Sequence, residues 1–139
     1  MQKTKEFLGQ IKRIESEIES KMADIEHWKS VALSITPQSD GERVQSSSDK
    51  QKMANAVIRY VDLERECDAL IDSLVDKRQE IISIIEQLDN DLEYNVISKH
   101  YVQFKSFVAI AEETHYSYAY ILEVHKNGIE KISKLVNIL

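Results

Sequence analysis

The sequence predicts an all-α protein, with a long antiparallel coiled-coil hairpin in residues 1–90 and a helix-turn-helix domain in residues 91–139. Three observations predict this fold class. Gly and Pro, on which most turns between strands depend, number only 3 and 1 in 139 residues. Apolar residues recur every three or four positions along two long segments, which is the spacing of a helical seam. Shorter amphipathic stretches follow in the C-terminal third.

The first seam extends from about residue 4 to residue 35. Its positions are Phe7, Ile11, Ile14, Ile18, Ile25, Trp28, Ala32 and Ile35, with one gap at Lys21. Pro37 cannot continue a helix, and the serine-rich stretch 36–48 predicts a long loop. Such a loop is either a simple linker or a contact surface.

The second seam follows this loop, and Asp49 is a suitable residue to cap its helix. The seam positions are Met53, Ala56, Tyr60, Leu63, Cys67, Leu70, Leu74, Ile81, Ile84 and Leu88, with one gap at Lys77. An antiparallel hairpin would pair Ile35 with Met53, Ala32 with Ala56, Trp28 with Tyr60, Ile25 with Leu63, Ile18 with Leu70, Ile14 with Leu74 and Phe7 with Ile81. A register shifted by one heptad fits nearly as well.

One hairpin leaves the apolar residues Val31, Leu33, Ile71 and Ile85 uncovered. Because exposed apolar edges favour association, we expect a homo-oligomer that forms through the long helices.

The C-terminal third begins after a break at Asp89-Asn90-Asp91. A short helix is expected next, with Leu92, Val96, Ile97 and Tyr101 facing inward. The chain then turns at Phe104-Lys105, and Ser106 is expected to cap a further helix.

Residues 107–126 fit the helix-turn-helix template. The template needs a small residue where two helices cross, and Ala111 supplies it. Its other core positions are taken by Ile110, Tyr116, Ile121 and Val124. Ser117 is expected to cap the second helix, while His115 occupies the turn position where glycine is usual.

The charge is unevenly distributed along the chain. The net charge is −6, of which residues 1–98 contribute −7 and residues 99–139 contribute +1. Because DNA phosphates repel an acidic surface, any DNA contact is expected in the C-terminal third. The candidate DNA-binding residues are Ser117, Tyr118, Tyr120 and Lys126.

Three segments together are similar to a known family. Residues 100–111 resemble its signature Arg-Tyr…Trp-x-x-Ile-Ala, residues 116–125 resemble Tyr-Ser-x-x-x-Val-x-x-Leu-His, and Arg43-Val44-Gln45-Ser46-Ser47, Met53-Ala54 and Asp62-Leu63-Glu64 resemble an upstream landmark. The family consists of small proteins from phages and integrative elements of Gram-positive bacteria and is similar to ArpU/RinA-type phage late transcription activators. The resemblance implies a fold like region 4 of sigma-70 factors. Its members often have arginines where this chain has Ala119, Glu123 and Asn127.

Two functions are consistent with these features. The first is an oligomeric DNA-binding regulator of phage or mobile-element genes, which binds a promoter or operator and has RNA polymerase as a candidate partner. The second is a protein-interaction module that has lost DNA binding and in which the acidic coil binds a host or phage protein.

Other function classes lack support in the sequence. The four histidines do not have the spacing of metal ligands, and no nucleophile–base pair or phosphate-binding glycine loop is present, so no metal, no cofactor and no catalytic residue is expected. No apolar run approaches the roughly 20 residues of a membrane span. The charged N-terminal segment and the lone Cys67, expected to be a buried apolar residue, predict a cytoplasmic protein of a bacterial host.

Overall fold

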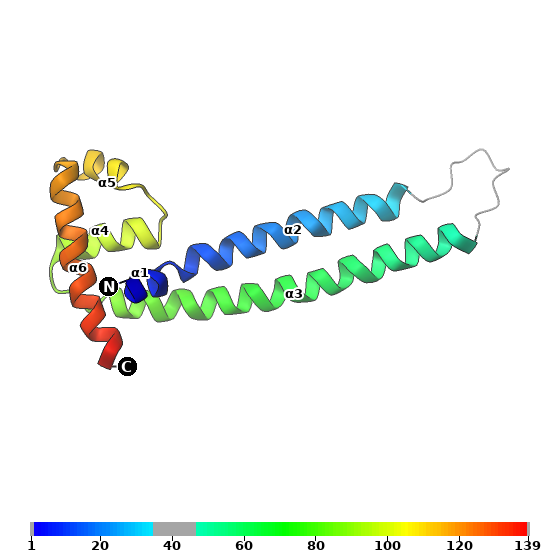
Figure 1. The fold of residues 1–139 in the computed structure, drawn as a ribbon, viewed down its shortest axis with the longest axis horizontal. Coiled ribbons are helices and arrows are strands. Elements are labelled where there is room, and N and C mark those ends of the chain that lie inside the picture. Colours follow the sequence, from blue (N-terminus) through cyan, green and yellow to red (C-terminus); the bar gives the residue numbers. More distant parts are fainter. Residues whose placement is uncertain (1, 35–46, 139) are drawn as a thin grey trace. The chain divides into compact units, whose positions relative to one another are not determined.

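The computed structural model describes residues 2–34 and 47–138. Within these ranges the regular structure consists of six helices and no strand, which confirms the all-α prediction. The helices are α1 (Gln2–Leu8), α2 (Gln10–Ser34), α3 (Ser47–Ile85), α4 (Asp91–Tyr101), α5 (Phe107–Thr114) and α6 (Tyr118–Ile138) (Figure 1). Most of the predicted loop 36–48, and Ile35 of the first seam, lie outside the described residues.

The chain divides into two compact units. Unit 1 comprises residues 1–15 and 73–139, and unit 2 comprises residues 16–72. This division differs from the predicted boundary at residue 90. The physical reason is that the N-terminal residues and the end of α3 share one apolar core with the C-terminal helices, which sequence order alone does not reveal.

The larger core of unit 1 contains ten buried apolar side chains: Leu8, Ile11, Ile81, Ile84, Ile85, Leu88, Ile97, Val102, Ile129 and Ile132. Phe7 and Leu74 pack against this cluster, in agreement with the predicted seam. Ile85, predicted to be an uncovered edge, is only 1% exposed, because residues of α4 and α6 pack in the same cluster. That prediction was wrong.

A break at Gly9 divides the first predicted helix into α1 and α2. The Gly9 amide donates to the Lys5 carbonyl oxygen at 2.9 Å. A Cβ atom at Gly9 would lie 3.2 Å from that same oxygen, which is a tight contact. The lack of a side chain therefore allows the close approach at this corner, where both Leu8 and Ile11 are buried.

Unit 2 pairs part of α2 with part of α3. Lys21 forms an ion pair with Glu66 at 2.7 Å, and Lys29, further along α2, pairs with Glu64, which is earlier on α3, at 3.4 Å. The two helix segments are therefore antiparallel.

The core of unit 2 is small and follows the predicted seam. Ile25, Leu63 and Cys67 are buried, and Ile18, Trp28 and Tyr60 pack against them. The predicted partners Ile25 and Leu63 thus belong to one cluster, as do Trp28 and Tyr60. Trp28 is half-buried. Asp49, predicted as the cap of α3, instead lies in its first turn, because the helix already begins at Ser47.

The remaining helices of unit 1 begin at capped ends and pack on one another. Asn90 caps α4, where its side-chain oxygen accepts a hydrogen bond from the Glu93 amide at 3.0 Å. Helix α6 crosses α4 (Figure 1), and Gly128 lies at this crossing. A Cβ at Gly128 would lie 3.0 Å from Cγ1 of Ile97, so glycine permits the close packing.

Candidate nucleic-acid interface

Helices α5 and α6 are joined by a short, well-defined turn. His115 caps the C-terminus of α5 with φ 62° and ψ 27°, the left-handed conformation that glycine adopts most easily. Ser117 Oγ accepts a hydrogen bond from the Tyr120 amide at 3.1 Å, and Ser106 Oγ accepts one from the Ala109 amide at 3.1 Å. Both predicted serine caps are therefore confirmed. His115, which occupies the turn position where glycine is usual, has the backbone conformation that glycine favours there.

Four of the five predicted core residues of this segment are buried. Ile110, Ala111, Ile121 and Val124 form a cluster together with Val96 of α4. The fifth residue, Tyr116, was predicted to be part of this core, and that prediction was wrong. Tyr116 is 48% exposed. The partly buried Leu92 and Phe107 cover this cluster instead.

An exposed aromatic surface occupies the turn and the start of α6. We define the tyrosine surface as Tyr116, Tyr118 and Tyr120, which are 48%, 50% and 42% exposed. The rings of Tyr116 and Tyr120 are in contact, with centroids 5.1 Å apart. The predicted contact residues Ser117, Tyr118, Tyr120 and Lys126 are all exposed, and so is Glu123.

The basic residues of the C-terminal third are mostly engaged with carboxylates. Glu113 pairs with both Lys99 and Lys105, and Lys131 pairs with the buried Glu93 at 2.6 Å. The Lys105 and Lys99 ammonium groups hold the pKa of the Glu113 carboxyl below its usual value. No ion pair among the described residues involves Lys126, so its charge remains available for a ligand.

A partly buried polar cluster lies beneath α5 and α6, and sequence reasoning did not find it. The Tyr101 hydroxyl and Nε2 of His125 share a hydrogen bond of 2.7 Å, and Nδ1 of His100 donates to the Lys105 carbonyl oxygen at 2.8 Å. Phe107 stacks on His100 with ring centroids 4.0 Å apart. The only sequence signal was that His125 continues the helical spacing of the apolar residues Ile121 and Val124.

Burial sets the protonation of this cluster. It lowers the pKa of His125 to about 4, with smaller contributions from the charges of His100 and Lys5. It also raises the pKa of Tyr101 to about 12. At neutral pH His125 is therefore neutral, and the Tyr101 hydroxyl keeps its proton.

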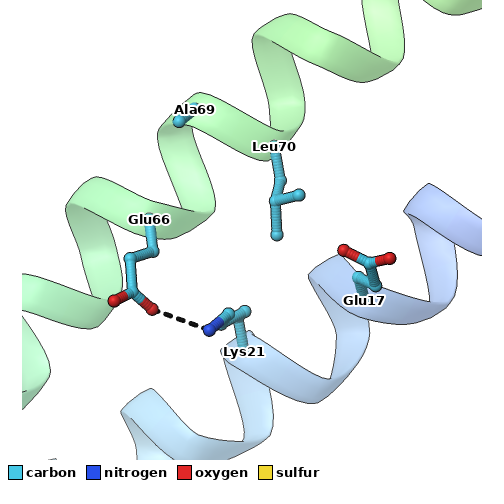
Figure 2. A pocket seen from close by; sticks show the side chains of 5 residues that line it. All are labelled: Glu17, Lys21, Glu66, Ala69 and Leu70. Carbon is cyan, nitrogen blue, oxygen red and sulfur yellow. Dashed lines mark hydrogen bonds and ion pairs between the residues drawn. The ribbon is translucent and has the colours of Figure 1, made fainter.

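Two of the hollows in the described part of unit 2 lie between its antiparallel helices. Figure 2 shows the first, of about 390 Å³, where the Lys21–Glu66 ion pair lies beside Leu70 and Glu17. The second, of about 360 Å³, has the exposed apolar residues Met22 and Ile71 at its edges. Its charged lining consists of Glu26, Lys29, Glu64 and Asp68, three acidic groups against one basic group.

Residues 2–34 and 47–138 contain no group of three His, Cys, Asp or Glu side chains placed to hold a metal ion. In the same ranges no helix combines the length and apolar content needed to cross a bilayer. Comparisons with protein-family models, with curated proteins and with solved structures find no match.

Proposed function

We propose that the chain is a DNA-binding transcriptional regulator of phage or mobile-element genes that acts inside the bacterial host. Helix α6 would enter the major groove with its N-terminal end, as second helices of such motifs do. The observation that supports this most is the capped three-residue turn, which holds the tyrosine surface in solvent at the start of α6.

The residues of this surface can contact both base edges and phosphates. Ser117 and the tyrosine hydroxyls can donate and accept hydrogen bonds at base edges or phosphates. Lys126, one helical turn beyond Leu122, would pair with a phosphate. Because few lysines are free, one copy would bind weakly, and two linked copies would gain affinity through their combined contacts.

We propose that the copies associate through unit 2. Among its described residues only four apolar side chains are buried, namely Ile25, Ala56, Leu63 and Cys67, while Met22, Leu33, Ile58 and Ile71 are well exposed. A second copy would cover such side chains. Light scattering at tens of micromolar should therefore give a dimer or larger species, and RNA polymerase is a candidate further partner of the DNA-bound form.

A mobility-shift assay on DNA upstream of the chain's own operon tests the DNA proposal. Lys126→Ala should weaken binding to all sequences alike, and Tyr118→Ala should change sequence preference if its ring reaches a base edge. The matched control is Lys52→Ala, an exposed lysine on α3 of unit 2, which should leave affinity unchanged. Absence of any shift at low salt would refute the proposal.

A second candidate function is supported by the Met22–Ile71 hollow of unit 2. An apolar groove with an acidic rim suits a basic amphipathic helix of a partner protein. In that case the chain would be an interaction module without DNA binding. A basic amphipathic helical peptide should then bind the wild type, and Asp68→Lys should abolish its binding, whereas Asp49→Lys on the first turn of α3 should not.

A further inference from the structure

Unit 1 has a hollow whose lining includes two lysines, Lys12 and Lys105. It lies between the α1–α2 corner, which contributes Gly9 and Lys12, and the segment from the end of α4 to the cap of α5, which contributes His100, Tyr101, Lys105 and Ser106. Its volume is about 350 Å³. No carboxylate of the described residues lines it, although the whole chain has a net charge of −6. Its lining therefore offers hydrogen-bond donors and positive charge to an anion.

The wall of this hollow is rigidly held. Phe104 adopts a left-handed conformation with φ 60°, and its side chain packs against the core of unit 1. The Lys105 amide donates to the Lys99 carbonyl oxygen at 3.0 Å, and His100 Nδ1 donates to the Lys105 carbonyl oxygen at 2.8 Å. The backbone at Lys105 and Ser106 is thus fixed before any ligand arrives, which lowers the entropic cost of binding.

The side chains of the hollow keep donors for a ligand. No ion pair among the described residues involves Lys12, and its side chain is exposed. Lys105 pairs with Glu113, but an ammonium group has three N–H donors. Ser106 Oγ accepts from the Ala109 amide, so its O–H remains able to donate. Gly9 has no side chain to fill the space between them.

The fold adds basic residues that are distant in sequence from the C-terminal third. Residues 2–15 contain Lys3, Lys5, Lys12 and Arg13 against Glu6 and Glu15. These residues belong to unit 1 with α4, α5 and α6. Unit 1 therefore contains more basic residues than residues 99–139 alone, while residues 73–98 add six acidic side chains against two basic ones.

We propose that this hollow is a binding site for one phosphate group, held by the ammonium groups of Lys12 and Lys105 and by the Ser106 hydroxyl. Its size admits a phosphodiester with part of its sugar. The proposal that this phosphate group belongs to a DNA backbone rests on the function proposed above, whereas the proposal that the site binds phosphate does not. A free phosphate or phosphorylated small molecule would offer the same group.

The first test is an NMR titration of the full chain with inorganic phosphate at constant ionic strength, with chloride as the control anion. The amide signals of Gly9, Lys105 and Ser106 should shift and saturate with phosphate but not with chloride. Lys12→Gln should abolish this response, whereas Lys134→Gln, an exposed lysine near the end of α6, should retain it. Equal responses to both anions, or an unaltered response in Lys12→Gln, would overturn the site.

The second test identifies the source through the salt dependence of DNA binding. Loss of one phosphate contact lowers the slope of log affinity against log salt by about 0.9, so Lys12→Gln should reduce it by that amount. A response to phosphate without any DNA binding would refute the proposed function and keep the phosphate site. A response to phosphate with an unchanged slope in Lys12→Gln would exclude the DNA backbone as its source.

Discussion

The hydroxyl of Tyr101 and Nε2 of His125 are joined by a 2.7 Å hydrogen bond that links the end of α4 to α6. The two rings also stack, with centroids 5.6 Å apart. His125 is 8% exposed, and this burial lowers the pKa of its imidazole to about 4. The neutral imidazole is therefore part of the folded structure of unit 1.

The first prediction concerns pH. The pKa of His125 is lowered from 6.5 to about 4 in the folded state, so between these values the unfolded chain binds the extra proton. The free energy of unfolding should then fall as the pH falls from 6.5, by about 1.4 kcal/mol per pH unit, until the pH approaches 4. Urea unfolding between pH 7 and pH 5 measures this decline.

The matched variant for this prediction is His125→Gln, which keeps a side-chain acceptor for Tyr101 but cannot titrate. Its stability should depend much less on pH between 7 and 5 than that of the wild type. Equal slopes in the two proteins would show that His125 is not the group responsible.

The second prediction concerns the crossing of α4 and α6. Alanine is favoured over glycine within a helix by about 1 kcal/mol. A Cβ at Gly128 would nevertheless lie 3.0 Å from Cγ1 and 3.2 Å from Cδ1 of the fully buried Ile97. Gly128→Ala should therefore lower the free energy of unfolding by about 1–2 kcal/mol, as overpacking does.

Because Ile97→Val removes the Cδ1 atom, it should make Gly128→Ala less costly in the double variant than in the wild type. Asn127→Ala, at an exposed position one residue earlier on α6, is the control and should be nearly neutral. A stabilising effect of Gly128→Ala would mean that the helices do not cross this closely.

The third prediction compares the two non-glycine residues with positive φ. His115 and Phe104 have φ values of 62° and 60°, but His115 is exposed whereas Phe104 packs against the core. His115→Gly should stabilise the protein by about 0.5–1 kcal/mol, because a left-handed conformation is strained for residues other than glycine. Thermal unfolding measures this gain.

Phe104→Gly relieves the same backbone strain but removes apolar packing, so it should destabilise the protein by about 2 kcal/mol. Opposite signs for the two substitutions are the expected result. A loss of stability in His115→Gly would contradict the strained turn.

Local sequence signals predicted much of the fold. The three-four spacing placed Ile25, Leu63 and Cys67 in one core, and the capping preference of serine identified Ser106 and Ser117 correctly. Both features depend on residues within one or two helical turns, which explains why a single sequence reveals them.

Features that depend on tertiary packing could not be predicted in this way. The burial of Ile85 and of His125 results from contacts with residues far away in the sequence. The exposure of Tyr116 has a similar origin, because Leu92 and Phe107 already cover the core that it was expected to fill. The hollow at Lys12 and Lys105 likewise requires two segments about ninety residues apart.

The last prediction tests whether the start of α6 approaches DNA. Glu123 and Glu130 are both exposed on α6, and Glu130 is seven residues further from the turn. That separation corresponds to about 10 Å along a helix, which is close to the screening length at 0.1 M salt. The two positions therefore differ in distance from the proposed interface but not in charge.

The decisive measurement is the affinity of Glu123→Arg for operon-upstream DNA at low salt, by fluorescence anisotropy, beside Glu130→Arg and the wild type. The proposed function predicts that Glu123→Arg binds more tightly than the wild type, because a repulsive charge is replaced by a phosphate contact. It also predicts a clearly smaller gain for Glu130→Arg. An affinity of Glu123→Arg equal to that of the wild type, or no DNA binding by any of the three, would contradict it.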